Sequence, residues 1–117
     1  MIVKKPWGTY EVLLDEPNYK VKRIVVHPYE RFSLQYHKHR EEHWVIVEGD
    51  GIVQVNEKEY PAYVRTHWVI LPTQKHRATA GPNGLIFIET QTGDCREEDI
   101  IRLEDDYGRH DSDVVSV

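Results

Sequence analysis

Short apolar runs separated by turn residues recur along the chain, roughly every 8 to 12 residues. Turn-forming residues lie between them, as in Asp15-Glu16-Pro17-Asn18, Gly49-Asp50-Gly51 and Gly81-Pro82-Asn83-Gly84. Regularly spaced short strands of this kind are typical of an antiparallel sandwich or barrel. We therefore expect one all-β domain over residues 1–117, with at most a helical turn over residues 96–101. The expected strands are residues 9–14, 19–27, 31–39, 44–48, 52–56, 59–64, 67–71, 76–80 and 85–91.

The strand expected at residues 31–39 alternates between an apolar row and a polar row. The apolar row is Phe32, Leu34 and Tyr36, and the polar row is Ser33, Gln35, His37 and His39. Two interpretations are open. In an isolated strand the apolar row would be core and the polar row solvated, whereas in a small ligand-holding barrel the polar row would line a cavity. The second interpretation requires cover for the apolar row from the N-terminal segment or a second chain. It predicts a homodimer, which sedimentation at micromolar concentration would detect.

Metal-binding side-chain types are densest in residues 35–44. His37 and His39 are two residues apart, so in an extended chain both imidazoles would point to the same face. A short turn would then bring Glu42 beside them from the next strand. Two imidazoles and a carboxylate suit a divalent transition metal. His76 follows an apolar run that ends at Pro72, and on a neighbouring antiparallel strand it could supply a fourth ligand.

Composition and charge exclude several other classes of protein. The net charge of −5 argues against a nucleic-acid partner, which would favour a basic face. No apolar stretch approaches the roughly 18 residues needed to span a membrane, so no membrane partner is expected. The first residues lack the apolar segment of a signal peptide. A single cysteine, Cys95, cannot form an internal disulfide and fits a reducing compartment, so we expect a cytoplasmic protein.

The order of the candidate ligands resembles the cupin family, which implies an antiparallel jelly-roll barrel (a double-stranded β-helix). The first cupin motif corresponds to His37, His39, Glu42 and Gly49, and the second to Pro72 and His76. Two residues separate His39 from Glu42, where the general motif has three or four. Counting back from Gly49 selects Glu42, because a hairpin there would fix the register. The loop before His76 is one residue shorter than usual.

Further motifs narrow the resemblance to the type II mannose-6-phosphate isomerases. They are Pro6-Trp7-Gly8-Thr9-Tyr10-Glu11, residues 19–24, residues 33–40 with Glu42-His43-Trp44, and residues 99–109. In that family the module commonly forms the C-terminal part of bifunctional mannose-1-phosphate guanylyltransferases. Here we expect a stand-alone module, without guanylyltransferase activity.

The resemblance implies metal-dependent interconversion of mannose 6-phosphate and fructose 6-phosphate through an enediol, feeding GDP-mannose and polysaccharide synthesis. It implies a divalent ion, zinc first and manganese, cobalt, nickel or iron as alternatives, on His37, His39, Glu42 and His76. Arg40 is the candidate for electrostatic catalysis. Gln35 and Arg109 are candidate substrate-binding residues, with Arg109 as phosphate anchor. The base that moves the proton is not assigned.

Two other functions remain open at this point. A non-catalytic sugar- or metal-binding cupin would be stabilised by its ligand without turnover. A cupin with other carbohydrate chemistry, such as nucleotide-sugar epimerisation, is also compatible, because the fold does not determine the reaction.

Overall fold

The computed structural model describes residues 1–108, which form nine β-strands joined by turns and loops, with no helix among them. Every strand pairing is antiparallel, so the all-β antiparallel prediction is confirmed. The strands are β1 (Ile2–Lys5), β2 (Gly8–Asp15), β3 (Tyr19–Val26), β4 (Leu34–Tyr36), β5 (Arg40–Val55), β6 (Lys58–Tyr63), β7 (His67–Ile70), β8 (His76–Gly93) and β9 (Ile101–Glu104).

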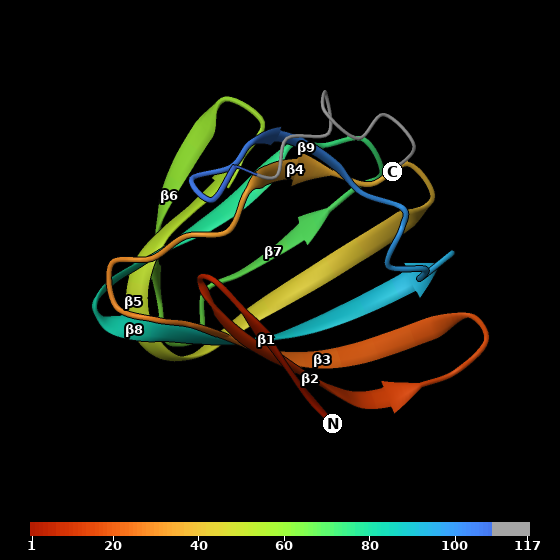
Figure 1. Ribbon diagram of the computed structural model, residues 1–117, viewed down its shortest axis with the longest axis horizontal. Coiled ribbons are helices and arrows are strands. Elements are labelled where there is room, and N and C mark those ends of the chain that lie inside the picture. Colours follow the sequence, from red (N-terminus) through yellow and green to blue (C-terminus); the bar gives the residue numbers. More distant parts are fainter. Residues whose placement is uncertain (109–117) are drawn as a thin grey trace.

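The two long strands β5 and β8 hold the curled sheet together. The second half of β8 pairs with β3 on one side and with the first half of β5 on the other. The first half of β8 pairs with β4 and with the second half of β5. Figure 1 shows both strands bending, so that β1, β2 and β3 face β4, β9 and β6 across an interior. Side chains from both halves of the sheet meet in that interior.

Glycines allow β5 and β8 to bend while remaining continuous strands. The hairpin turns predicted at residues 49–51 and 81–84 are wrong, because both segments lie inside a strand. The register of β5 against β8 shifts between Gly49 and Gly51. Gly49 has a φ of 84°, and a Cβ on it would lie 2.1 Å from the carbonyl oxygen of Gly84. Glycine is needed here for the close approach of two bent strands.

Several short segments differ from the predicted secondary structure. β1 and β9 were not predicted, and the helical turn predicted at residues 96–101 is wrong, because residues 96–100 form a turn and loop and Ile101 begins β9. The strand predicted at residues 31–39 is regular only at β4. Both β1 and β9 have only four residues, too few to give a strand signal, and β9 is placed by its pairing with the distant strand β4.

A core of aromatic and aliphatic side chains fills the interior. Trp44 lies at its centre, with ring centroids 4.6 Å from Phe87 and 5.8 Å from Phe32. Strand alternation explains how these side chains reach the interior, since Arg40, Glu42, Trp44 and Ile46 of β5 are buried and the residues between them are exposed. Thus β5 places polar and apolar groups side by side on its inner face.

The polar row of residues 31–39 largely follows the second interpretation, since Ser33, Gln35 and His37 line an interior cavity, whereas His39 is exposed. Phe32 and Leu34 are buried within the single chain, and so are Ser33 and Gln35 of the other row. The apolar row is therefore covered within the single chain, partly by Trp7 of the N-terminal segment, whose ring centroid lies 5.3 Å from that of Phe32, so no second chain is needed to cover it. The homodimer itself stays a prediction. A search of the described residues for a helix that could cross a membrane finds none.

Candidate metal centre and adjoining cavity

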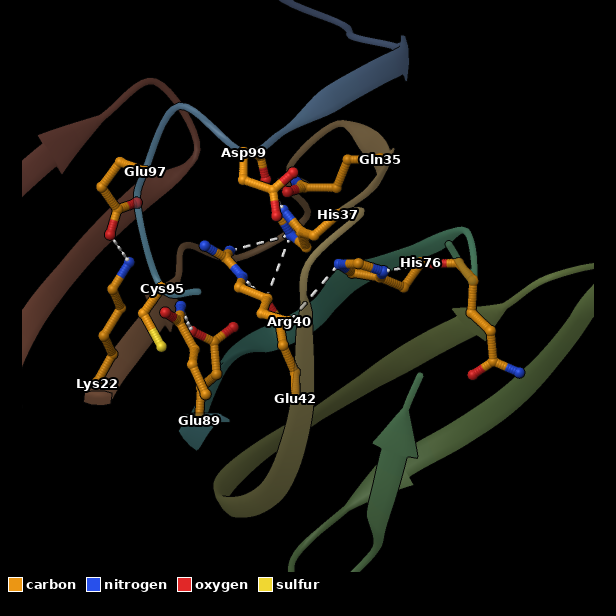
Figure 2. Close-up of polar contacts among 12 residues, drawn as sticks. Lys22, Gln35, His37, Arg40, Glu42, His76, Glu89, Cys95, Glu97 and Asp99 are labelled. Atoms are coloured by element: carbon orange, nitrogen blue, oxygen red, sulfur yellow. Dashed lines mark hydrogen bonds and ion pairs between the residues drawn. The ribbon is translucent and has the colours of Figure 1, made fainter. Parts of the chain in front are cut away.

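Three side chains of ligand type converge inside the curled sheet. They are His37, which follows β4, Glu42 of β5 and His76 at the start of β8, and all three are buried. One ligand atom from each lies within 4.8 Å of the others. The Nε2 of His37 is 3.3 Å from Glu42 Oε2, and the Nε2 of His76 is 3.6 Å from Glu42 Oε1. Figure 2 shows both imidazoles turned toward the carboxylate.

Hydrogen bonds to backbone carbonyls orient both imidazoles. The Nδ1 of His37 bonds the carbonyl oxygen of Asp99, and the Nδ1 of His76 bonds that of Gln74 at 2.9 Å. A carbonyl oxygen only accepts, so each Nδ1 carries the proton and each Nε2 keeps its lone pair. This is the usual arrangement of histidine ligands. With a buried carboxylate as the third donor, the cluster fits a divalent transition metal.

His39 does not join the cluster, so the prediction that it shares a face with His37 is wrong. The chain bends directly after His37, because the carboxylate of Asp99 accepts hydrogen bonds from the backbone N–H groups of Lys38 and His39 at 3.0 and 2.9 Å. The side chain of His39 is 60% exposed, with its Nδ1 3.5 Å from Asp99 Oδ2. An i, i+2 pair shares a face only while the strand is extended.

Gln35 lies beside His76, because the two residues are cross-strand partners of β4 and β8. Its Nε2 donates to the carbonyl oxygen and the hydroxyl of Ser33. Four residues lie between His37 and Glu42. The general cupin motif has three or four residues between its second histidine and its glutamate, so His37 fits the place of the second histidine. On this count, Gln35 stands where the motif has its first histidine. Counting from His37 instead of His39 could have found this from the sequence.

Arg40 is buried against Glu42 and His37. Its Nε donates to Glu42 Oε2 at 2.8 Å, its Nη2 to His37 Nε2 at 3.0 Å and its Nη1 to the carbonyl oxygen of Arg96 at 3.3 Å. Burial alone would raise the pKa of Glu42, but His76, His37 and Arg40 together outweigh it and hold that pKa below its ordinary value. Trp44 Nε1 also donates to Glu42, at 3.0 Å. Glu42 therefore remains an ionised, multiply bonded carboxylate.

Glu89 is a second buried carboxyl group that sequence reasoning missed. It lies on β8, accepts a hydrogen bond from Gln91 Nε2 at 2.6 Å and is hydrogen-bonded with Glu42. Burial and the neighbouring charge of Glu42 raise the pKa of Glu89 to about 8. Alternation could have revealed it, since Glu89 falls on the same face as Leu85 and Phe87. An inward-facing glutamate that follows two buried apolar residues of the same face is unusual.

A cavity of about 140 Å³ opens beside the cluster. Lys22 in its wall donates to Glu97 Oε2 at 2.6 Å and lies 4.2 Å from the centre of the Tyr10 ring. The wall thus combines basic groups with carboxylates and aromatic rings. Its basic residues are Lys5, Lys22, Arg40 and Arg102, and its carboxylates are Glu42, Glu89 and Glu97. Arg109, the predicted phosphate anchor, lies outside the described residues.

The two buried histidines predict that acid destabilises the fold when no metal is bound. Burial chiefly lowers the pKa of His37 from 6.5 to about 4 and lowers that of His76 as well. Between pH 6.5 and 4 the unfolded chain binds protons that the folded chain does not, so stability present above pH 6.5 is lost as the pH falls. The shift of His37 alone corresponds to about 3 kcal/mol.

Urea unfolding in the presence of a chelator measures this effect. We expect His37→Gln to have a flatter profile between these pH values than the wild type. His27→Gln should leave the profile unchanged, because His27 is exposed. A wild-type unfolding free energy that stays constant over this interval would contradict the neutral state of the two imidazoles.

Comparison with known proteins identifies the family to which the chain belongs. A family model described as "Mannose-6-phosphate isomerase C-terminal" matches residues 1–105. A mannose-1-phosphate guanylyltransferase of Klebsiella pneumoniae is 38% identical over 110 residues, and the alginate biosynthesis protein AlgA of Pseudomonas aeruginosa is 40% identical over 109. Both matches cover 92% of this chain but only 23% of the relative. The chain thus spans about a quarter of the length of these relatives.

Solved structures support the predicted cupin fold. An RmlC-like cupin from Shewanella frigidimarina superposes with a TM-score of 0.74 at 21% identity, covering 83% of this chain and 86% of that one. At this identity the likeness concerns the fold alone. The jelly-roll prediction is confirmed by this likeness together with the curled antiparallel sheet.

Proposed function

The chain belongs to the mannose-6-phosphate isomerase C-terminal family, and on that premise we propose that it is a metal-dependent isomerase of mannose 6-phosphate and fructose 6-phosphate. The observation that carries the proposal is the buried cluster of His37, Glu42 and His76, which opens onto a cavity that also contains Glu89. The names of the relatives, a mannose-1-phosphate guanylyltransferase and an alginate biosynthesis protein, favour a role in supplying GDP-mannose for polysaccharides.

Three residues would hold the metal: His37 and His76 through Nε2, and Glu42 through its carboxylate. Gln35 is beside them as a further oxygen donor or a substrate contact. When bound, the ion would stabilise negative charge on the sugar oxygens, as Lewis-acidic metals do. The residues around the cluster keep the site ready for this: Asp99 and Gln74 hold the imidazoles, and Trp44 holds the carboxylate.

Proton transfer between neighbouring carbons needs a group that can release and take back a proton near neutral pH. We assign this role to Glu89. In the aldose-to-ketose direction, its carboxylate takes the proton from C2 of mannose 6-phosphate to leave an enediolate, the hydroxyl proton of O2 passes to O1, and the carboxyl group returns its proton to C1. The raised pKa of Glu89, about 8, makes its carboxylate a stronger base than an exposed glutamate. Glu89 is buried and lies in the cavity wall.

Basic side chains match the charges that the substrate carries. Arg40 supplies a guanidinium beside the reacting carbons, where negative charge develops in the enediol. Lys5, Lys22 and Arg102 line the cavity from three other strands and give its wall the positive charge that a phosphate requires. Arg109 remains a proposed anchor for the phosphate on the evidence of the sequence.

A coupled assay that converts mannose 6-phosphate to fructose 6-phosphate tests the proposal. We expect turnover with the metal-loaded chain, loss of turnover after treatment with chelator, and recovery when metal is restored. His27→Gln serves as the control, since it removes an exposed histidine that does not belong to the cluster. Absence of turnover with zinc, manganese, cobalt and nickel would contradict the proposal. Stabilisation by the sugar phosphate without turnover would instead favour a binding protein.

A further inference from the structure

Arg40 forms hydrogen bonds with the atoms through which His37 and Glu42 would bind a metal ion. Its Nη2 donates to His37 Nε2, and its Nε donates to Glu42 Oε2 (Figure 2). The other nitrogen of His37 already bonds the carbonyl oxygen of Asp99, so Nε2 is the only ligand atom that His37 can offer. Its single lone pair can accept a hydrogen bond from Arg40 or bind a metal, but not both.

We propose that Arg40 and a divalent cation compete for His37, so that metal binding releases the Arg40 guanidinium into the cavity to bind an anionic sugar phosphate. The competition itself is independent of the proposed isomerase activity, whereas the role in binding the sugar phosphate rests on it. Arg40 would then be available as a substrate-binding residue only once the metal is in place.

The positive charge of Arg40 is a second reason why Arg40 and a metal ion would not share His37 and Glu42. Arg40 is only 6% exposed, and its guanidinium is permanently positive. A divalent cation that shares His37 and Glu42 with it would create strong repulsion in a poorly solvated site. The repulsion falls if the guanidinium moves away from His37.

The cavity offers the released guanidinium other acceptors. Glu89 and Glu97 line the same cavity and already interact electrostatically with Arg40. The carbonyl oxygen of Arg96 is within 3.3 Å of its Nη1. Loss of the bond to His37 therefore does not leave Arg40 buried without partners. A phosphorylated sugar would add a further anionic partner there, one that suits the planar guanidinium.

Zinc affinity measured by competition with a fluorescent chelator tests the first part. We expect Arg40→Met to bind zinc about 5- to 150-fold more tightly than the wild type, the usual range for coupling between sites. Arg31→Met is the matched control, because it removes an arginine–carboxylate pair with Asp106 on the surface. Its zinc affinity should equal that of the wild type. Equal or weaker binding by Arg40→Met, or no binding by either protein, would overturn the competition.

Nitrogen-15 NMR of the arginine side chains tests release directly in the wild-type protein, so it does not depend on how a variant folds. Zinc should shift the Arg40 Nε resonance and leave that of Arg31 unchanged. Mannose 6-phosphate should then shift the Arg40 resonance again in the zinc-loaded protein but not in the chelated protein. An Arg40 resonance unaffected by saturating zinc would overturn the release. A response to the sugar phosphate that is the same with and without zinc would overturn the ordered binding.

These measurements separate the inference from the proposed function. A protein that shows both zinc effects but no isomerase turnover contradicts the proposed reaction and supports the competition. A protein that turns over substrate while Arg40 stays on His37 contradicts the competition and supports the reaction.

Discussion

Replacing Glu42 with glutamine is expected to abolish metal binding and, with it, isomerase turnover. Glu42 contributes the only carboxylate of the cluster among the described residues, and its oxygens contact His37, His76 and Arg40. The loss of this charge also leaves Arg40 buried without its main ion-pair partner. Removing one member of a buried pair costs about 3–5 kcal/mol. Ionisation of Glu89 should offset part of that loss, because the charge of Glu42 no longer opposes it.

Metal content after dialysis, urea unfolding and the coupled assay together measure this effect. Glu41→Gln is the matched control, since Glu41 is the preceding residue of the same strand and faces solvent. We expect Glu41→Gln to retain metal, stability and turnover. A Glu42→Gln protein that keeps stoichiometric metal and wild-type stability would show that the cluster is not the metal site.

Replacing Glu89 with glutamine is expected to lower kcat by about 10²- to 10⁴-fold, the usual contribution of a general acid or base. Glutamine keeps the shape of the protonated side chain but cannot take up or release the proton. The protein should still bind metal, because Glu89 is not one of the three candidate ligands. Loss of kcat with retained metal would distinguish proton transfer from metal binding.

The same variant should be more stable than the wild type at alkaline pH. In the wild type the unfolded chain ionises Glu89 near pH 4.5, whereas the folded chain keeps the proton up to about pH 8. Stability is therefore lost as the pH rises through this interval, and glutamine removes that loss. Urea unfolding across the interval should show the advantage growing with pH. Glu59→Gln, on an exposed position of β6, should show neither effect. Wild-type turnover by Glu89→Gln would rule out the assignment of the base.

The strand pattern predicted the fold class, while the topology depended on contacts distant in sequence. Apolar runs bounded by turn residues identified β2 and β3. The sequence pattern could not distinguish a hairpin turn that ends a strand from a bend at a glycine within a continuous strand. At Gly49 the deciding contact is with the backbone of Gly84, 35 residues away, and no local pattern reports it. The edge strand β9 likewise depends on its pairing with β4.

The sequence predicted the three residues of the cluster, His37, Glu42 and His76, but wrongly added His39 as a fourth. Glu42 and His76 lie where the motif placed them, although the hairpin argument used to choose Glu42 was wrong. His39 was predicted to be a ligand because the strand was assumed to continue through it. The bend is imposed by Asp99, 60 residues later in the chain, through bonds to the backbone of Lys38 and His39. Glu89 was missed because a single glutamate in a strand gives no motif.

The account is tested most directly by NMR of mannose 6-phosphate incubated in D₂O with the metal-loaded protein. We predict that fructose 6-phosphate appears and that solvent deuterium enters the C1 and C2 positions, because a proton passing through a carboxyl group exchanges with solvent. The chelated protein and the Glu42→Gln variant should give neither signal. Metal-loaded protein that leaves mannose 6-phosphate unchanged, with no product and no deuterium incorporation, would contradict the central claim.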